Sequence, residues 1–279
     1  MAARRARKPF ARFWSEIRPT QMPKVRRIGD VSLTMQLREQ FEAVAWSASA
    51  VNKFVSASEA VNRTRRASRV VGRSGYTAYS VDYALAPEHP FPAGIDDTTA
   101  AYRALLEAGN DPSSIAFAGD SAGGGLTITT LIRARQQGLP MPAAVVAFSP
   151  GLDNAGTGAS YITKAGIDPI FTKESVQPNR DLYRGNADPD QDLLSPATLA
   201  DPIGFPPLLL QVGTNEILLD DSVAMAERAR DAGVDVILDV TADVPHVFQT
   251  YTGVLDEADL AIDRAVLFLT QHIVAPAKD

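Results

Sequence analysis

Short apolar runs alternate with helical segments along the sequence from Ser74 onward. This alternation is typical of a parallel β-sheet whose strands are joined by crossover helices, and it limits the fold to the α/β class. Few polar residues interrupt the apolar runs, which indicates strands that are buried on both faces. We expect strands at residues 76–83, 115–118, 143–148, 207–212 and 234–240, and helices at residues 95–108, 122–137, 221–232 and 257–272.

One stretch, residues 150–205, interrupts this alternation. It contains no long apolar run, is rich in proline, aspartate and glycine, and separates the third expected strand from the fourth. Long insertions of this kind inside a compact domain are usually functional. The 279 residues are within the length of a single large α/β domain. We therefore expect a core over residues 74–279, with a cap-like insertion at about 150–205.

The first 73 residues differ from the rest of the chain in charge. They contain 16 basic and 5 acidic residues, whereas 11 basic and 28 acidic residues follow them. Their arginine-rich start lacks the apolar core of a secretory signal, and no known nucleic-acid motif accompanies the basic residues. We interpret residues 1–73 as an atypical basic segment, either a cap or a divergent region, and we expect no nucleic-acid partner.

Cysteine is absent from the chain, which excludes disulfides, thiolate metal sites and a cysteine nucleophile. No apolar run approaches the roughly 18 residues that a membrane-spanning helix requires. The composition is globular, with 45% hydrophobic and 22% charged residues. These features favour a cytoplasmic protein without a membrane span, and we expect neither a metal ion nor another cofactor.

A serine set among glycines follows the second expected strand, in the sequence FAGDSAGGG. Gly119, Asp120, Ser121 and Gly123 form a G-x-S-x-G pattern between that strand and the next helix. A sharp turn of this kind exposes the serine oxygen above the sheet and directs helix N–H groups toward a reacting carbonyl. The alternative interpretation is a glycine-rich turn that only packs the helix against the strand.

A serine hydroxyl is a weak nucleophile and needs a neighbouring base that is oriented by a carboxylate. The chain has three histidines. His272 lies in the expected C-terminal helix, and His89 lies among prolines before the serine, so structural roles are the better interpretation for both. His246 directly follows the last expected strand. Because the carboxyl ends of parallel strands meet at one edge of a sheet, His246 is the candidate base for Ser121.

Three carboxylates compete for the acid position after the preceding strand: Glu216, Asp220 and Asp221. The two aspartates open an expected helix, where capping and the helix dipole give them a structural explanation. Glu216 lies in the loop between strand and helix and has no such explanation. The order Ser121, Glu216, His246 is the order of the catalytic triad along α/β-hydrolase chains.

Five segments carry a resemblance to a known family: VDYALAPEHPFPAG (81–94), GDSAGGGL (119–126), SPGLD (149–153), FPPLLLQVGTNEILLDDS (205–222) and DVPHVFQ (243–249). The chain resembles the hormone-sensitive-lipase-like family of α/β-hydrolase carboxylesterases from Ser74 onward. The resemblance implies an α/β-hydrolase fold, a mostly parallel sheet flanked by helices with a cap. It also implies a triad of Ser121, Glu216 and His246, and a small ester or lactone as substrate.

The first quarter of the chain departs from this family. Family members carry an HGGG-type loop whose N–H groups form most of the oxyanion hole, but the corresponding residues 50–58 read AVNKFVSAS. Asn52, Lys53 and Phe54 would place side chains where the substrate carbonyl should lie, which leaves the N–H of Ala122 as the one readable oxyanion donor. The first strands of the sheet are also unreadable, so this segment is either divergent or misread.

We therefore expect a serine hydrolase that cleaves short-chain esters or lactones through an acyl-enzyme on Ser121. The missing oxyanion loop predicts weak activity, because each lost donor slows the reaction about 10²- to 10³-fold. Two alternatives stay open: a catalytically impaired ligand-binding module, and a non-functional product on the same fold.

Overall fold

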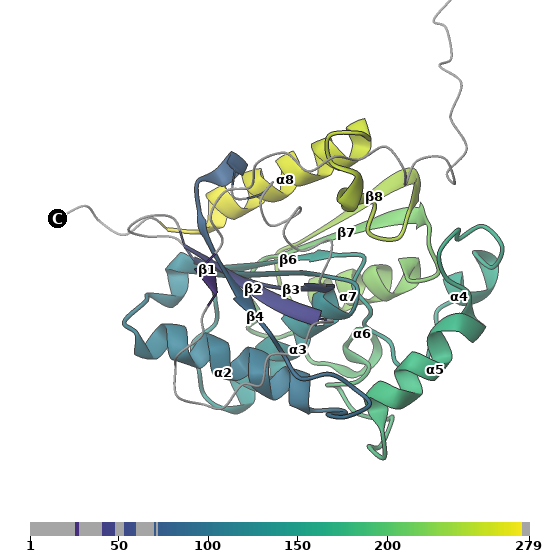
Figure 1. Ribbon diagram of the computed structural model, residues 1–279, viewed down its shortest axis with the longest axis horizontal. Helices are drawn as coiled ribbons and strands as arrows, with labels where there is room; N and C mark the ends of the chain where they lie inside the picture. The colour runs from purple at the N-terminus through teal and green to yellow at the C-terminus, as the bar shows by residue number, and fades with distance from the viewer. Residues whose placement is uncertain (1–25, 28–40, 48–52, 60–69, 71, 275–279) are drawn as a thin grey trace, which may run out of the picture.

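The computed structural model describes residues 26–27, 41–47, 53–59, 70 and 72–274 (Figure 1). These residues form one eight-stranded sheet in the order β1-β4-β2-β3-β5-β6-β7-β8. β2 runs antiparallel to both of its neighbours, and the other paired strands are parallel. The strands are β1 (Arg26–Arg27), β2 (Phe41–Ser47), β3 (Lys53–Glu59), β4 (Thr77–Val81), β5 (Ile115–Asp120), β6 (Ala144–Phe148), β7 (Leu208–Asn215) and β8 (Val236–Pro245).

Helices cover both faces of the sheet (Figure 1). Alternate residues of a strand point to opposite faces, and neighbouring residues of β5 accordingly belong to different clusters. Phe117 packs with the buried sides of α2 (Ala93–Glu107), α3 (Ala122–Gln136) and α7 (Leu219–Asp231). Ala116 and Ala118 pack with the buried side of α8 (Asp256–His272). The core is therefore a layer of apolar side chains on each face.

The α/β-hydrolase architecture expected from the sequence is confirmed. The five expected strands correspond to β4 to β8, and the four expected helices correspond to α2, α3, α7 and α8. Their ends differ from the expected ends by a few residues. The apolar runs were readable because β5, β6 and most of β7 are buried along their length.

Three strands lie before residue 73, where the sequence showed no readable strand. β3 pairs with β2 on one side and β5 on the other, so it is an inner strand of the sheet. Its sequence KFVSASE lacks the continuous apolar run by which the other inner strands were recognised. Pairing with β2 and β5, rather than its own composition, makes this segment a strand, so the local sequence did not predict it.

β3 also bears on the expectation about the missing glycine loop. Lys53 and Phe54 pair with Ile115 and Ala116, at the start of β5 and at the opposite end from Ser121. The backbone of Lys53 and Phe54 thus begins β3 at the end of the sheet away from Ser121, and this register does not favour the expectation that they meet the substrate carbonyl. Asn52, the third residue in that prediction, lies outside the described residues.

The insertion of residues 150–205 contains no strand, as expected. It holds three helices: α4 (Ser160–Thr163), α5 (Lys173–Arg184) and α6 (Pro196–Leu199). In Figure 1, α4 and α5 lie together at the right of the view, beyond α6 and α7. Across the described ranges, we find no helix with both the length and the apolar character to span a membrane.

Candidate active site

Ser121 stands alone between the last residue of β5 and the first residue of α3. Its φ of 54° is unusual for a residue other than glycine and marks a sharp, strained turn. Backbone hydrogen bonds fix this conformation: the Ser121 N–H donates to Phe148 O at 2.9 Å, and Ser121 O accepts from Gly151 N at 3.1 Å. The strain is thus held by the strand and loop next to the turn.

Close backbone approach explains the glycines around Ser121. A Cβ atom on Gly119 would lie 2.2 Å from the carbonyl oxygen of Gly123, and one on Gly125 would lie 2.4 Å from the carbonyl oxygen of Gly151. Both distances are far below a van der Waals contact. Larger residues at positions 119 and 125 would therefore push α3 away from β5 and from the loop after β6.

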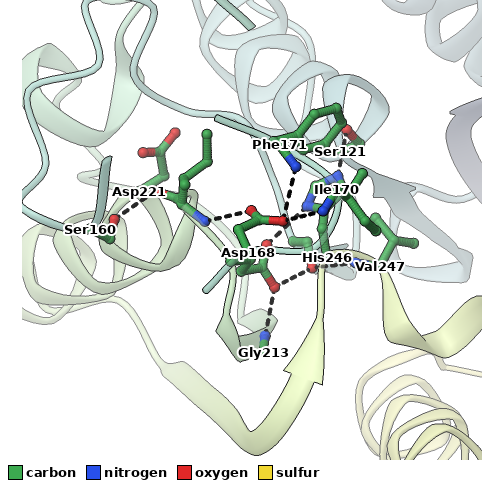
Figure 2. A network of polar contacts seen from close by, with 12 residues as sticks. Ser121, Ser160, Asp168, Ile170, Phe171, Gly213, Asp221, His246 and Val247 are labelled. Atoms are coloured by element: carbon green, nitrogen blue, oxygen red, sulfur yellow. Dashed lines mark hydrogen bonds and ion pairs between the residues drawn. The ribbon is translucent and has the colours of Figure 1, made fainter. Parts of the chain in front are cut away.

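The structure brings the side chains of Ser121, His246 and Glu216 together. His246 Nε2 lies 2.9 Å from Ser121 Oγ (Figure 2), and His246 Nδ1 lies 2.9 Å from Glu216 Oε2. His246 is 6% exposed and Glu216 is fully buried. Because an ionised carboxylate can only accept, Nδ1 donates to Glu216, and Nε2 of the neutral ring is left to accept the Ser121 proton.

The other carboxylate oxygen of Glu216 accepts hydrogen bonds from residues in or next to the strands β6 and β7. Glu216 Oε1 accepts hydrogen bonds from Ser149 Oγ at 2.8 Å and from Gly213 N at 2.6 Å. Ser149 Oγ in turn accepts from the N–H of Val247 at 3.0 Å. One fully buried hydroxyl thus joins the acid to the residue next to the histidine.

Sequence reasoning missed Ser149 as a site residue. It follows β6 directly, so it lies at the same sheet edge as Ser121 after β5 and His246 after β8. That position was the available signal, because polar residues just past the carboxyl ends of parallel strands gather at one edge.

The other candidate residues lie elsewhere. His89 is exposed in the loop before α2, and His272 is the last residue of α8, where its ring lies 4.5 Å from the Phe268 ring. In the part of the chain that the structure describes, neither of these two histidines has a hydrogen bond to Ser121. His246 alone occupies the position of a base for Ser121 among the described residues.

Asp220 and Asp221 lie in the first turn of α7, where the helix dipole favours a negative charge as expected, but they do not cap the helix, so the capping part of that expectation is wrong. The N-cap of α7 is Leu218, which makes no side-chain cap bond. Asp220 Oδ2 instead accepts from Ser160 N at 2.7 Å. Asp221 Oδ2 accepts from the N–H groups of residues 152 and 153 at 2.8 and 3.0 Å. Both carboxylates therefore bind the insertion.

The position of Ala122 suits the oxyanion donor that the sequence predicts. It is the first residue of α3, and the first N–H groups of a helix have no intrahelical acceptor. Residues 60–69, which follow β3, lie outside the described residues and contain no glycine. Within the described ranges, no cluster of three or more histidine, aspartate or glutamate side chains is arranged to hold a metal ion.

Comparison with known sequences places this geometry in a family. A profile described as alpha/beta hydrolase fold matches residues 53–250. An acetyl-hydrolase of Streptomyces hygroscopicus is 40% identical over 196 residues, which cover 70% of this chain and 65% of that protein. An esterase of Acinetobacter venetianus is 35% identical over 202 residues, which cover 72% of this chain and 66% of that protein. The chain thus spans slightly less than two thirds of the length of these relatives.

Solved structures give the same result over more of the chain. An esterase from the bacterial hormone-sensitive lipase family is 40% identical, with a TM-score of 0.77 over 86% of this chain and 88% of that one. The structure of EstE5 soaked with p-nitrophenyl butyrate is 32% identical, with a TM-score of 0.78 and the same coverage. On this evidence the chain belongs to the alpha/beta hydrolase fold family and, within it, to the bacterial hormone-sensitive lipase family.

Proposed function

We propose that the protein is a serine carboxylester hydrolase. Ser121 is the nucleophile, His246 is the general base and Glu216 orients the imidazole. The observation that carries this proposal is the continuous chain of hydrogen bonds from Ser121 Oγ through His246 to Glu216, with both contacts at 2.9 Å. A hydrogen-bond chain of this kind, with a buried base and acid behind a serine at a strained strand-to-helix turn, is the arrangement that activates a serine hydroxyl.

In the first half of the reaction, Ser121 Oγ attacks the carbonyl carbon of the ester while His246 Nε2 takes the hydroxyl proton. The N–H of Ala122 donates to the negatively charged oxygen that forms on the carbonyl. Collapse of this intermediate breaks the bond to the alcohol oxygen, and His246 returns the proton to the departing alcohol. The acyl group then remains bound to Ser121 Oγ.

In the second half, water attacks the acyl carbon and His246 again accepts a proton, now from the water. The bond between the acyl carbon and Ser121 Oγ then breaks, His246 returns its proton to Oγ, and the carboxylic acid leaves. Glu216 keeps its charge throughout and stabilises the imidazolium that forms twice in each turnover. Its hydrogen bonds from Ser149 and Gly213 hold the carboxylate in place during both steps.

The proposed substrates are short-chain carboxylic esters or lactones. Two relatives are named acetyl-hydrolase and esterase, which supports an ester of a small acyl group. EstE5 was soaked with p-nitrophenyl butyrate, which makes that ester the natural first assay. We propose that activity is weak, because no glycine-rich loop follows β3 in the sequence.

We also propose that the insertion of residues 150–205 is a cap on a core of residues 74–279. The contact between Phe171 and His246, with ring centroids 5.0 Å apart, supports this assignment. A cytoplasmic location is part of the proposal, and the absence of cysteine from the chain is consistent with it.

Labelling with a fluorophosphonate tests the proposal without a choice of substrate. The reagent should attach to Ser121 of the wild-type chain, and the labelled peptide can be identified by mass spectrometry. Hydrolysis of p-nitrophenyl butyrate should be measurable in the same preparation. A chain that is folded by thermal melt but takes no label and hydrolyses no ester would contradict the proposal.

A further inference from the structure

Asp168 links the insertion to the loop that carries the acid. Its side chain is 7% exposed. Oδ1 accepts hydrogen bonds from Ile170 N at 2.8 Å and Phe171 N at 3.0 Å (Figure 2). Oδ2 accepts a hydrogen bond from Ile217 N at 2.9 Å. Pro169 has no N–H, so the first amides after Asp168 that can reach its carboxylate are those of the next two residues.

The two residues that Asp168 joins, Ile217 and Phe171, both lie next to the triad. Ile217 directly follows Glu216 and is fully buried. Phe171 lies against His246, with ring centroids 5.0 Å apart and ring planes at 66°. Phe171 also packs against the apolar cluster that contains Ile217. A single carboxylate therefore ties the backbone of the acid residue to an aromatic ring that covers the base.

We propose that Asp168 is a positioning residue for the triad, acting on Glu216 through the Ile217 amide and on His246 through Phe171. The inference rests on the proposed hydrolase function and extends it to the insertion. Ser149, at the end of β6, bonds to Glu216 and to the residue after His246. Asp168, in the insertion, bonds to the residue after Glu216 and to Phe171, whose ring contacts His246. Displacement of a reacting group by about 1 Å can slow a reaction about 10²-fold, so this second anchor affects the rate.

Asp168→Asn is the informative variant, because asparagine has the same shape but only one acceptor oxygen. It can keep the bonds to Ile170 and Phe171 or the bond to Ile217, but not both. We expect kcat for p-nitrophenyl butyrate to fall about 10- to 100-fold with KM nearly unchanged. The rate of fluorophosphonate labelling should fall with it, since labelling also uses His246.

Asp153→Asn is the matched control. Asp153 is also a buried carboxylate of the insertion, 4% exposed, and it accepts from Ala155 N at 3.0 Å and Thr157 N at 2.7 Å. These bonds stay within the insertion and do not reach the acid loop. We expect Asp153→Asn to lower the melting temperature while kcat stays within about twofold of wild type. Equal losses of kcat in the two variants would overturn the inference.

Phe171→Leu tests the same route without removal of a buried carboxylate, so it remains informative if Asp168→Asn does not fold. Leucine keeps an apolar contact with the cluster but removes the ring from His246. We expect about a 10-fold lower kcat and an unchanged KM, and a double variant that loses less than the product of the single losses. An unchanged kcat in Phe171→Leu, or strict additivity, would overturn the inference.

The outcomes for wild type separate the two proposals. A wild-type chain that takes no label and hydrolyses no ester contradicts the hydrolase proposal and this inference together. A wild-type chain that is labelled and active, with Asp168→Asn indistinguishable from Asp153→Asn, contradicts the role of Asp168 alone.

Discussion

At the scale of single residues, Ser149 is the least expected part of the site. Its hydroxyl donates to Glu216 and accepts from the N–H of Val247, so it links the proposed acid to the residue after the proposed base. Its φ of 44° is held in an unfavourable region. A strained, fully buried residue that joins the proposed acid to the residue after the proposed base suggests the hypothesis that Ser149 has a functional role.

Ser149→Ala should lower both activity and stability. The variant leaves the buried N–H of Val247 without a partner, which costs roughly 1–3 kcal/mol, and removes one donor from Glu216. We expect a lower melting temperature and about a 10-fold loss of kcat, measured with p-nitrophenyl butyrate. Ser222→Ala is the control, because Ser222 is equally buried and its hydroxyl has no hydrogen-bond partner among the described residues. Similar losses of kcat in both variants would argue against a role for Ser149.

Glu216→Gln distinguishes the acid from its neighbours. A glutamine can turn its NH₂ group toward Nδ1 of His246, which disrupts the tautomer that the base requires. By analogy with the Asp-to-Asn change in other triads, we expect kcat to fall by up to about 10⁴-fold in a folded protein. Asp220→Asn should keep its activity, because Asp220 binds Ser160 rather than His246. Unchanged kcat in Glu216→Gln would move the role to another carboxylate.

At the scale of elements, Asp221 joins α7 to the insertion. It accepts from the N–H groups of Leu152 and Asp153 and from the Tyr161 hydroxyl at 3.0 Å. Tyr161 also contacts the guanidinium of Arg180, which lies over its ring at 4.6 Å from the centroid. Through the Asp221 carboxylate, the start of α7 thus binds α4 and the loop that follows β6. It reaches α5 indirectly, through Tyr161.

The titration of Asp221 predicts a pH-dependent stability. Burial raises its pKa to about 7, and this effect outweighs the amide of Leu152 and the charge of Arg180, which favour ionisation. An aspartate in an unfolded chain titrates at about 4. Between about pH 4 and pH 7 the folded protein therefore holds a proton that the unfolded chain has lost. This contribution to stability is present below about pH 4 and is lost as the pH rises through 7.

Asp221→Asn provides the measurement, because asparagine does not titrate. We expect the melting temperature of the wild type, relative to that of Asp221→Asn, to fall between pH 4 and pH 8. Subtraction of one variant from the other removes the contributions of all other groups. A difference that stays constant or rises with pH would show that Asp221 is ionised throughout this range.

The elements that could be predicted from the sequence are those whose own residues show a recognisable pattern. β4 to β8 and the four long helices follow from apolar runs and their spacing, and the serine turn follows from its glycines. β3 could not be predicted, because KFVSASE is stabilised as a strand by β2 and β5 rather than by local composition. The bonds from Asp220 and Asp221 to the insertion could not be predicted either, since sequence gives no contact between distant segments.

At the scale of the whole molecule, the predicted site residues converge because of the sheet. Ser121 follows β5, Glu216 follows β7 and His246 follows β8, so chain order and strand direction place them at one edge. The sequence therefore indicated which residues would meet. The contacts of Ser149 were not predicted, although its position directly after β6 was an available signal. The contacts of Asp168 depend on the path of the insertion and could not be predicted from the sequence.

The oxyanion donors decide how active the whole chain can be. The N–H of Ala122 is the one proposed donor, and no glycine occurs in residues 60–69 after β3. The loss of one donor slows acyl transfer about 10²- to 10³-fold. We expect kcat/KM for p-nitrophenyl butyrate below the ordinary range, which begins at about 10⁴ M⁻¹s⁻¹. A value in or above that range would mean that another segment supplies the remaining donors.

The central claim is that Ser121 is a nucleophile activated by His246, and fluorophosphonate labelling of wild type, Ser121→Ala and His246→Ala tests it most directly. We expect one label per wild-type chain, on the peptide that contains Ser121. Ser121→Ala should take no label, and His246→Ala should react orders of magnitude more slowly, because triad members act as a unit. Labelling that persists in Ser121→Ala, or an unlabelled but folded wild type, would contradict the claim.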